Sequence, residues 1–198
     1  GLKPVHWCMD CGSALAEAEV EYEDKQSHAV DVAFAVQDVA DFAKRANLTN
    51  VPAAVDFVIW TTTPWTLPAN QAVSLHPELI YVVVQATIEQ QTRVLVLAQA
   101  LYEATLARYQ AEDIHVLAEV AGAAFEHVAL QHPFYGRTVP VIVGEHVTAD
   151  AGTGAVHTAP GHGHDDFVVG KKYNLIVDNP VDNNGVFLPN TPLFAGMH

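Results

Sequence analysis

The chain has 198 residues, of which 50% are apolar and 16% are charged, and this composition excludes a disordered segment because it can bury a substantial core. Its formal net charge is −14, from 9 basic and 23 acidic residues, which excludes a protein that grips nucleic acid through a basic surface of its own. If the protein acts on a nucleic acid, we expect another part of a larger polypeptide to hold most of that partner. The chain does not begin with Met, which also suggests a piece of a longer polypeptide.

Residues 1–12 (GLKPVHWCMDCG) are rich in Gly, Pro and Cys and predict a ribbon or knuckle. Cys8 and Cys11 have the C-x2-C spacing of half a structural zinc site, although two free thiols fit the spacing equally well. Two cysteines make no disulfide scaffold, so we expect a cytoplasmic protein. The predicted organisation is a partial zinc-ribbon-like segment at residues 1–12, followed by one domain at residues 13–198.

The first half of the domain predicts few elements. Residues 13–22 fit either a short helix or a strand, and residues 36–46 carry apolar side chains at helical spacing. Residues 55–59 alternate as a strand, which we expect to lead into a polar loop at residues 60–70.

Strands dominate the second half. Residues 80–86 and 93–98 predict a hairpin around Glu89-Gln90-Gln91, and residues 114–120, 137–143 and 155–158 predict further strands. Helices are expected at 99–110 and at 165–174, where acidic residues begin the segment and lysines end it. Many short strands, few helices and no repeated βαβ unit predict an α+β, mainly β, β-barrel-like fold. The longest apolar runs fall far short of the roughly 18 residues that span a bilayer, so no membrane partner is expected.

The stretch WTTTPWTLPAN at residues 60–70 is dense in Thr and Trp. Threonine hydroxyls donate and accept hydrogen bonds while the methyl groups are apolar, which suits a small ligand with a branched aliphatic part and oxygens. Pro64 and Pro68 would make the loop rigid enough to select by size. The alternative is a Thr-rich strand end in which Trp65 anchors the core.

A second stretch, GTGAVHTAPGHGHDD at residues 152–166, combines glycines with histidines and aspartates. Glycines allow close backbone approach to a carbonyl or phosphate oxygen, and the ionisable side chains offer proton transfer, ammonium recognition or metal binding. The spacing matches neither H-E-x-x-H nor the common phosphate-binding loops. The alternative for each histidine is a solvated loop residue.

Three segments, WCMDCGSALAEAEVEYEDK, WTTTPWTLPANQAV and GTGAVHTAPGHGHDDF, occur in this order and together resemble the editing insertion of bacterial isoleucyl-tRNA synthetases. The related valyl and leucyl enzymes carry a similar insertion, but the three segments together resemble the isoleucyl enzyme more closely. The HIGH and KMSKS motifs of the synthetic site are absent from the chain, so we expect no amino-acid activation by it.

The resemblance implies a β-barrel editing domain that hydrolyses the ester of misacylated valyl-tRNA(Ile) and excludes isoleucyl-tRNA(Ile). It implies that Thr62, His157 and Asp166 carry the reaction, with Asp166 on the substrate ammonium and His157 in the pocket. The implied substrate-binding set is Trp60, Thr61, Thr62, Thr63, Trp65, Thr66, Asn70, His157, Gly161 and Asp166. Editing would need no metal or other cofactor, whereas the full-length enzyme could bind zinc at Cys8 and Cys11.

The implied partners are the 3′ end of aminoacylated tRNA(Ile) and the rest of the synthetase chain, and we expect a monomer. One alternative is the same role in a valyl-tRNA synthetase, which would clear threonyl-tRNA. A second is a metal-dependent hydrolase with His157, His162, His164 and Asp166 as ligands. A third is a non-catalytic module that docks tRNA.

Overall fold

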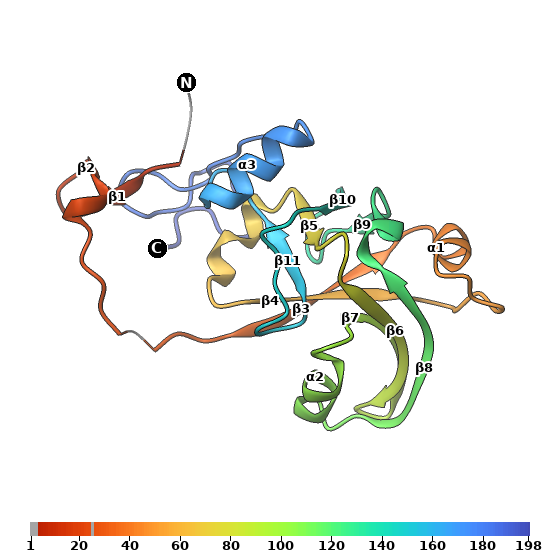
Figure 1. Cartoon of the computed structure of the whole chain (residues 1–198). Coiled ribbons are helices and arrows are strands. Elements are labelled where there is room, and N and C mark those ends of the chain that lie inside the picture. Colours follow the sequence, from red (N-terminus) through yellow and green to blue (C-terminus); the bar gives the residue numbers. More distant parts are fainter. Residues whose placement is uncertain (1–3, 25) are drawn as a thin grey trace. The chain divides into compact units, whose positions relative to one another are not determined.

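Two compact units make up the chain (Figure 1), and a computed structural model describes them over residues 4–24 and 26–198. Residues 1–3 of the predicted zinc-ribbon-like segment, and Lys25, lie outside the described residues. One unit, the sheet unit, comprises residues 29–62 and 72–158. The other, the loop unit, comprises the described residues before 29 together with 63–71 and 159–198. The predicted division into residues 1–12 and 13–198 stays a prediction.

The loop unit begins with a hairpin of two short antiparallel strands, β1 (His6–Cys8) and β2 (Ser13–Leu15). A 3-10 turn, η1 (Glu17–Glu19), follows, so residues 13–22 contain a strand and a helical turn rather than one element. The indole Nε1 of Trp7 donates to the carbonyl of Asn183 at 2.9 Å, which ties the hairpin to the C-terminal loops of the same unit. The remaining elements are the 3-10 helix η2 (Pro64–Ala69) and helix α3 (His164–Lys172), which confirms the predicted C-terminal helix.

The sheet unit is built on nine strands: β3 (Val30–Val36), β4 (Asp56–Thr61), β5 (Ala72–Leu75), β6 (Ile80–Ile88), β7 (Gln91–Ala98), β8 (Glu112–Ala121), β9 (Ala129–Gln131), β10 (Thr138–Val143) and β11 (Ala155–Thr158). Their order across the sheet is β11-β5-β10-β9-β3-β4-β7-β6-β8. The predicted β6–β7 hairpin is confirmed, and its turn places Glu89 and Gln90 at φ of 48° and 64°. Two consecutive residues with positive φ are typical of the tight turn whose twist matches that of paired strands.

Helix α1 (Val39–Arg45) starts later than the predicted 36–46, because Val36 belongs to β3. Asp38 begins the helix: its side chain accepts a hydrogen bond from the backbone N–H of Asp41 at 2.9 Å. Helix α2 (Tyr102–Arg108) confirms the helix predicted within 99–110, and a short 3-10 turn, η3 (Gly122–Phe125), follows β8.

The core of the sheet unit has two visible parts. Leu106 of α2 packs on buried aliphatic residues of β4, β6 and β7, among them Val58, Val84 and Leu97. Phe42, Phe57 and Phe125 form an aromatic cluster that joins α1, β4 and η3, with ring centroids 5.1–5.9 Å apart. Both parts pack against β4, which ends at Thr61, the first threonine of the candidate site.

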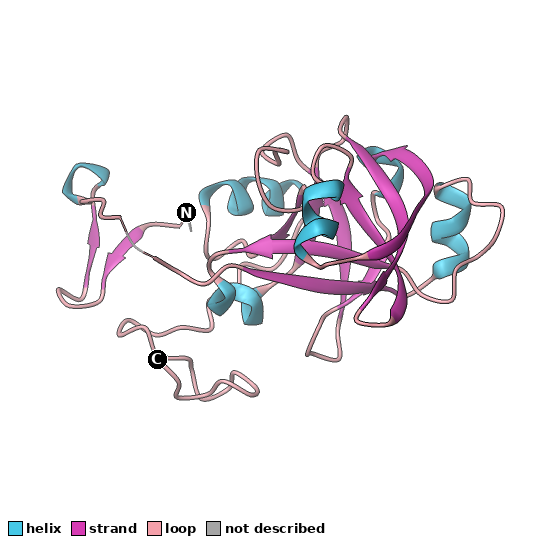
Figure 2. Ribbon diagram, turned by 90° about the horizontal axis from the view of Figure 1, so that it is seen from below, coloured by secondary structure: helices cyan, strands magenta, loops and turns pink. Residues whose placement is uncertain are grey.

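The mainly β class is therefore confirmed, with a sheet that curves strongly around its own core (Figure 2). Among the described strands the sheet stays open, because β11 and β8 end its order without pairing to each other. The predicted strand at 55–59 continues through Thr61, and the predicted polar loop contains the helical turn η2. Within residues 4–24 and 26–198, no helix is long and apolar enough to cross a membrane.

Candidate functional site

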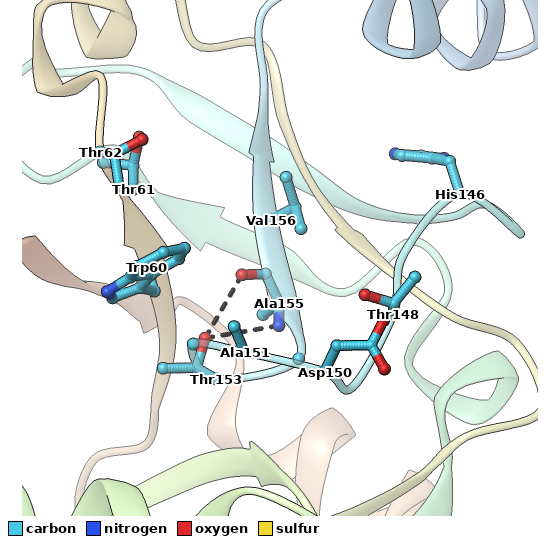
Figure 3. Close-up of a pocket in the computed structure, with 12 residues that line it drawn as sticks. Trp60, Thr61, Thr62, His146, Thr148, Asp150, Ala151, Thr153, Ala155 and Val156 are labelled. Atoms are coloured by element: carbon cyan, nitrogen blue, oxygen red, sulfur yellow. Dashed lines mark hydrogen bonds between the residues drawn. The ribbon is translucent and has the colours of Figure 1, made fainter. Parts of the chain in front are cut away.

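A pocket of about 310 Å³ opens in the sheet unit at the end of β4. On one side stand Trp60, Thr61 and Thr62, which belong to the predicted substrate-binding set (Figure 3). On the other side lies the loop after β10, and the turn that leads into β11 runs between them (Figure 3). The other lining residues are His146, Thr148, Asp150, Ala151, Gly152, Thr153, Gly154, Ala155 and Val156.

Trp60 and Thr61 end β4, and Thr62 follows the strand. Phe57, Val58, Ile59 and Thr61 are buried, Trp60 is half-buried and Thr62 is exposed. The ring of Trp60 packs on Gly152, where a Cβ atom would lie 3.0 Å from the ring and the φ of +77° favours glycine. The pocket therefore presents threonine hydroxyls beside an indole ring.

The far side of the pocket supplies ionisable groups that sequence reasoning missed. Asp150 contributes a carboxylate, and the buried Nε2 of His146 has no hydrogen-bond partner among the described residues. His146, Thr148 and Asp150 lie in a loop without a recognisable motif, so only the adjacent Gly152-Thr153-Gly154 pointed to this part of the chain. The pocket can therefore bind a polar ligand through the threonine hydroxyls on one side and the imidazole of His146 on the other.

His157 lies on β11 in the same unit, opposite Val73 of β5. Its side chain is 7% exposed, and it is not among the residues that line the 310 Å³ pocket, whereas its neighbour Val156 is. The adjacent Thr158 shares a buried hydrogen bond of 2.6 Å between its hydroxyl and that of Ser74. β11 is thus held firmly on β5, and the assignment of His157 to a substrate pocket stays a prediction.

The remaining predicted residues belong to the loop unit. Thr63 precedes η2, whose first residue is Pro64. The hydroxyl of Thr66 donates to the carbonyl of Thr63 at 2.9 Å and so stabilises the first turn of this helix. Thr66 and Asn70 are buried, whereas Trp65 is 52% exposed and meets the ring of His162 edge-on at 5.4 Å. Trp65 is therefore not a core anchor.

Asp166 lies in the first turn of α3, where its Oδ2 accepts a hydrogen bond from the backbone N–H of Ala159 at 2.9 Å. Gly161 has a structural reason to be glycine, because a Cβ there would collide with the carbonyl of Asp178. Burial lowers the pKa of His162, although the nearby Asp178 opposes the shift. The loop unit thus orients the carboxylate of Asp166 at the start of a helix.

Metal binding has little support in the described residues. No group of three or more His, Cys, Asp or Glu side chains within residues 4–24 and 26–198 is arranged to hold a metal ion. His157 belongs to the sheet unit, whereas His162, His164 and Asp166 belong to the loop unit, and the alternative with these four residues as ligands stays a prediction.

Cys8 and Cys11 lie close together at the tip of the β1–β2 hairpin, where the N–H of Cys11 donates to Sγ of Cys8 at 3.2 Å. The hydrogen bond between the two thiols lowers the pKa of Cys8 and raises the pKa of Cys11, and the N–H of Cys11 also lowers the pKa of Cys8. This geometry fits two ligands of a zinc knuckle.

Comparison with known proteins decides the family. Residues 26–188 match the family described as "Leucyl-tRNA synthetase, editing domain". The chain belongs to this family of editing domains. It is 60% identical over 198 residues to isoleucine–tRNA ligase from Nitrosococcus oceani and 62% identical over 201 residues to that from Alkalilimnicola ehrlichii, which covers 99% and 100% of this chain. The chain spans about a fifth (21%) of the length of these curated relatives.

Solved structures agree with the fold of the editing domain. The editing domain of P. knowlesi cytosolic leucyl-tRNA synthetase matches with a TM-score of 0.63 at 14% identity, over 74% of this chain and 62% of that one. The corresponding P. falciparum domain matches with a TM-score of 0.61 at 14% identity, over 74% and 67% of the two chains. The chain is thus an editing domain of an aminoacyl-tRNA synthetase in both sequence and fold.

Proposed function

We propose that this editing domain hydrolyses the ester bond of valyl-tRNA(Ile) and leaves isoleucyl-tRNA(Ile) intact. The observation that carries the proposal is the 60–62% identity, along the whole chain, to proteins named isoleucine–tRNA ligase. Isoleucine and valine differ by one methylene, which is worth only ~1–3 kcal/mol in a binding pocket. A synthetic site alone therefore misacylates, and a second site that admits the smaller side chain corrects the error.

The proposed chemistry is hydrolysis of an activated ester by an oriented water molecule. Asp166 holds the α-ammonium group of the substrate, which fixes the position of the carbonyl carbon. The hydroxyl of Thr62 orients the attacking water, and the side chain of His157 limits the room for the amino-acid side chain. The proposed substrate-contacting residues are completed by Trp60, Thr61, Thr63, Trp65, Thr66, Asn70 and Gly161.

The presence of Thr61 and Thr62 on the wall of a 310 Å³ pocket supports this assignment, since that volume suits a small ligand group. The helix-start position of Asp166 supports its role as well, because its carboxylate is already oriented by the N–H of Ala159. Reaction of an ester with water needs no metal, and the domain is proposed to edit without a cofactor.

The proposed partners are the 3′ end of aminoacylated tRNA(Ile) and the rest of the synthetase chain, in a monomeric enzyme of the cytoplasm. Zinc in that enzyme would be held by Cys8 and Cys11. Two thiols are half of the usual four zinc ligands, and the described residues supply no third ligand. The proposed hydrolysis uses no zinc in any of its steps.

The test is deacylation by the full-length enzyme of three purified substrates: valyl-tRNA(Ile), isoleucyl-tRNA(Ile) and threonyl-tRNA(Val). Rapid hydrolysis of the first alone is expected. Preference for threonyl-tRNA(Val) would assign the domain to a valyl enzyme, and no hydrolysis of any ester would leave only a docking role.

A further inference from the structure

Trp65 and His162 form an aromatic pair in the loop unit. Trp65 belongs to η2, and His162 belongs to the loop that precedes α3. Their ring centroids are 5.4 Å apart and the ring planes are nearly perpendicular, at 88°. Perpendicular packing at this separation is a favoured arrangement of two aromatic rings. The contact therefore gives the side chain of Trp65 a preferred orientation.

This contact matters because the ring of Trp65 is otherwise weakly held. Its side chain is 52% exposed, so solvent surrounds about half of it. Pro64 starts η2 and Pro68 lies within it, which restricts the backbone around Trp65 but leaves the side-chain torsions free. The orientation of the indole thus depends on the ring of His162.

The imidazole of His162 makes no hydrogen bond through its buried nitrogen. Its Nε2 is buried and has no hydrogen-bond partner among the described residues. A buried polar atom without a partner costs free energy, so this nitrogen does not stabilise the loop unit. The side chain of His162 contributes through its ring instead, and the ring that it meets is that of Trp65.

The backbone of His162 is held by a turn that also binds Asp166. The N–H of His162 donates to the carbonyl of Ala159 at 2.8 Å, and the N–H of Ala159 donates to Oδ2 of Asp166 at 2.9 Å. Pro160, within the turn, is buried and restricts its backbone. The turn therefore connects Asp166 with the partner of Trp65, and these are two of the proposed substrate contacts.

We propose that His162 is a positioning residue of the editing site, which holds the exposed ring of Trp65 in the orientation that receives the substrate. The inference rests on the proposed ester hydrolysis, in which Trp65 contacts the substrate. His162 itself touches no reacting atom. A ring that is already oriented loses less conformational freedom when the ester binds, so the contact favours binding.

The first experiment measures kcat/KM for deacylation of valyl-tRNA(Ile) by the full-length enzyme. We expect about three- to tenfold lower kcat/KM for His162→Ala, because the freed ring of Trp65 must be ordered by the substrate. His162→Phe keeps a ring and lacks the unpaired nitrogen, so it should retain the parental value. His164→Ala removes a nearby exposed histidine and is the matched control. A parental kcat/KM for His162→Ala would overturn the proposal.

A double-mutant cycle tests whether His162 acts through Trp65. Once Trp65→Ala has removed the indole, His162→Ala should lower kcat/KM no further, because no ring is left to orient. A residue that only stabilised the fold would cause the same loss in both backgrounds, and that outcome contradicts the proposal. If His162→Ala fails to fold, His162→Asn takes its place in the cycle with the same expected result, since it also lacks the ring.

The parent enzyme and Trp65→Ala separate this inference from the proposed function. If the parent does not deacylate valyl-tRNA(Ile), the proposed function fails. If the parent is active and Trp65→Ala matches it, ester hydrolysis stands and only the role of the aromatic pair is wrong.

Discussion

Asp166 has a structural bond that its proposed chemical role must accommodate. Its Oδ2 accepts the N–H of Ala159, at the point where the chain leaves the sheet unit. A carboxylate held in this way can present its charge to an ammonium group without first having to be ordered, so the bond favours the role. It also means that removing the side chain has two consequences, the loss of the charge and the release of a backbone N–H.

Replacing Asp166→Ala is expected to depress hydrolysis of every ester offered, because valine and isoleucine share the ammonium group. The loss of a charge-assisted contact and of positioning should cost about 2–4 kcal/mol, or roughly 30- to 1000-fold in rate. The measurement is single-turnover deacylation of valyl-tRNA(Ile). Asp166→Asn retains an oxygen for Ala159 and isolates the effect of charge, while the exposed Asp165→Ala is the control. Parental rates for Asp166→Ala would refute the assignment.

His157 is expected to control selectivity rather than rate. If its imidazole occupies the space that an extra methylene would need, His157→Ala should allow isoleucyl-tRNA(Ile) to be hydrolysed while hydrolysis of valyl-tRNA(Ile) falls less. The measurement is the ratio of the two deacylation rates, with the exposed His164→Ala as control. A variant that spares isoleucyl-tRNA(Ile) as strictly as the parent would transfer the selective role to Thr61, Thr62 and Thr63.

The sequence predicts site residues where the local composition is unusual, but not those that come from an ordinary loop or a distant part of the chain. Thr61 and Thr62 could be predicted because a run of threonines at a strand end is rare. His146 and Asp150 could not, since they lie in an ordinary loop and reach the pocket only through the path of the chain after β10. The bond from Tyr81 to Gly154 spans 73 residues, and no local pattern indicates it.

At the scale of elements, runs of β-forming residues that flank a turn were a good guide. β6 and β7 were predicted from such runs, although most of their residues are buried without alternation. β5 was missed because Ala72–Leu75 is short and buried throughout, so neither periodicity marks it. β3 was missed in part because Val36 also fits the helical spacing of the following residues, until the cap at Asp38 decides where the helix begins.

The turn before β11 should be intolerant of side chains. At Gly154 an added Cβ would collide with Cβ of Ala98, and the φ of +78° disfavours other residues. We expect Gly154→Ala to lower the free energy of unfolding by about 2–4 kcal/mol, as the sum of backbone strain and overpacking. Urea unfolding of the chain measures this. Gly136→Ala is the control, because a Cβ there meets nothing within 4 Å, and equal stability of the two variants would contradict the prediction.

At the scale of the whole molecule, the acidic charge is understandable for an editing domain. In the proposed reaction only the terminal adenosine and its ester have to reach the candidate site, so we expect most of the tRNA to be held elsewhere in a synthetase. The chain spans 21% of the length of its curated relatives, which leaves ample polypeptide for that task. A net charge of −14 then has the advantage of discouraging unproductive binding of tRNA to the domain itself.

The isolated chain should therefore fold but bind tRNA weakly. Affinity for nucleic acid comes mostly from cations that neutralise phosphates and release counterions, and nine Lys and Arg residues against 23 acidic ones provide few such contacts. We expect a Kd for uncharged tRNA(Ile) weaker than about 10 μM at physiological salt, with a shallow dependence of log Kd on log salt. Circular dichroism checks the fold, and fluorescence anisotropy across a salt series measures the binding, with the full-length enzyme as the positive control. Nanomolar affinity of the isolated chain with a steep salt slope would mean that the domain has a tRNA-binding surface of its own, contrary to this account of its charge.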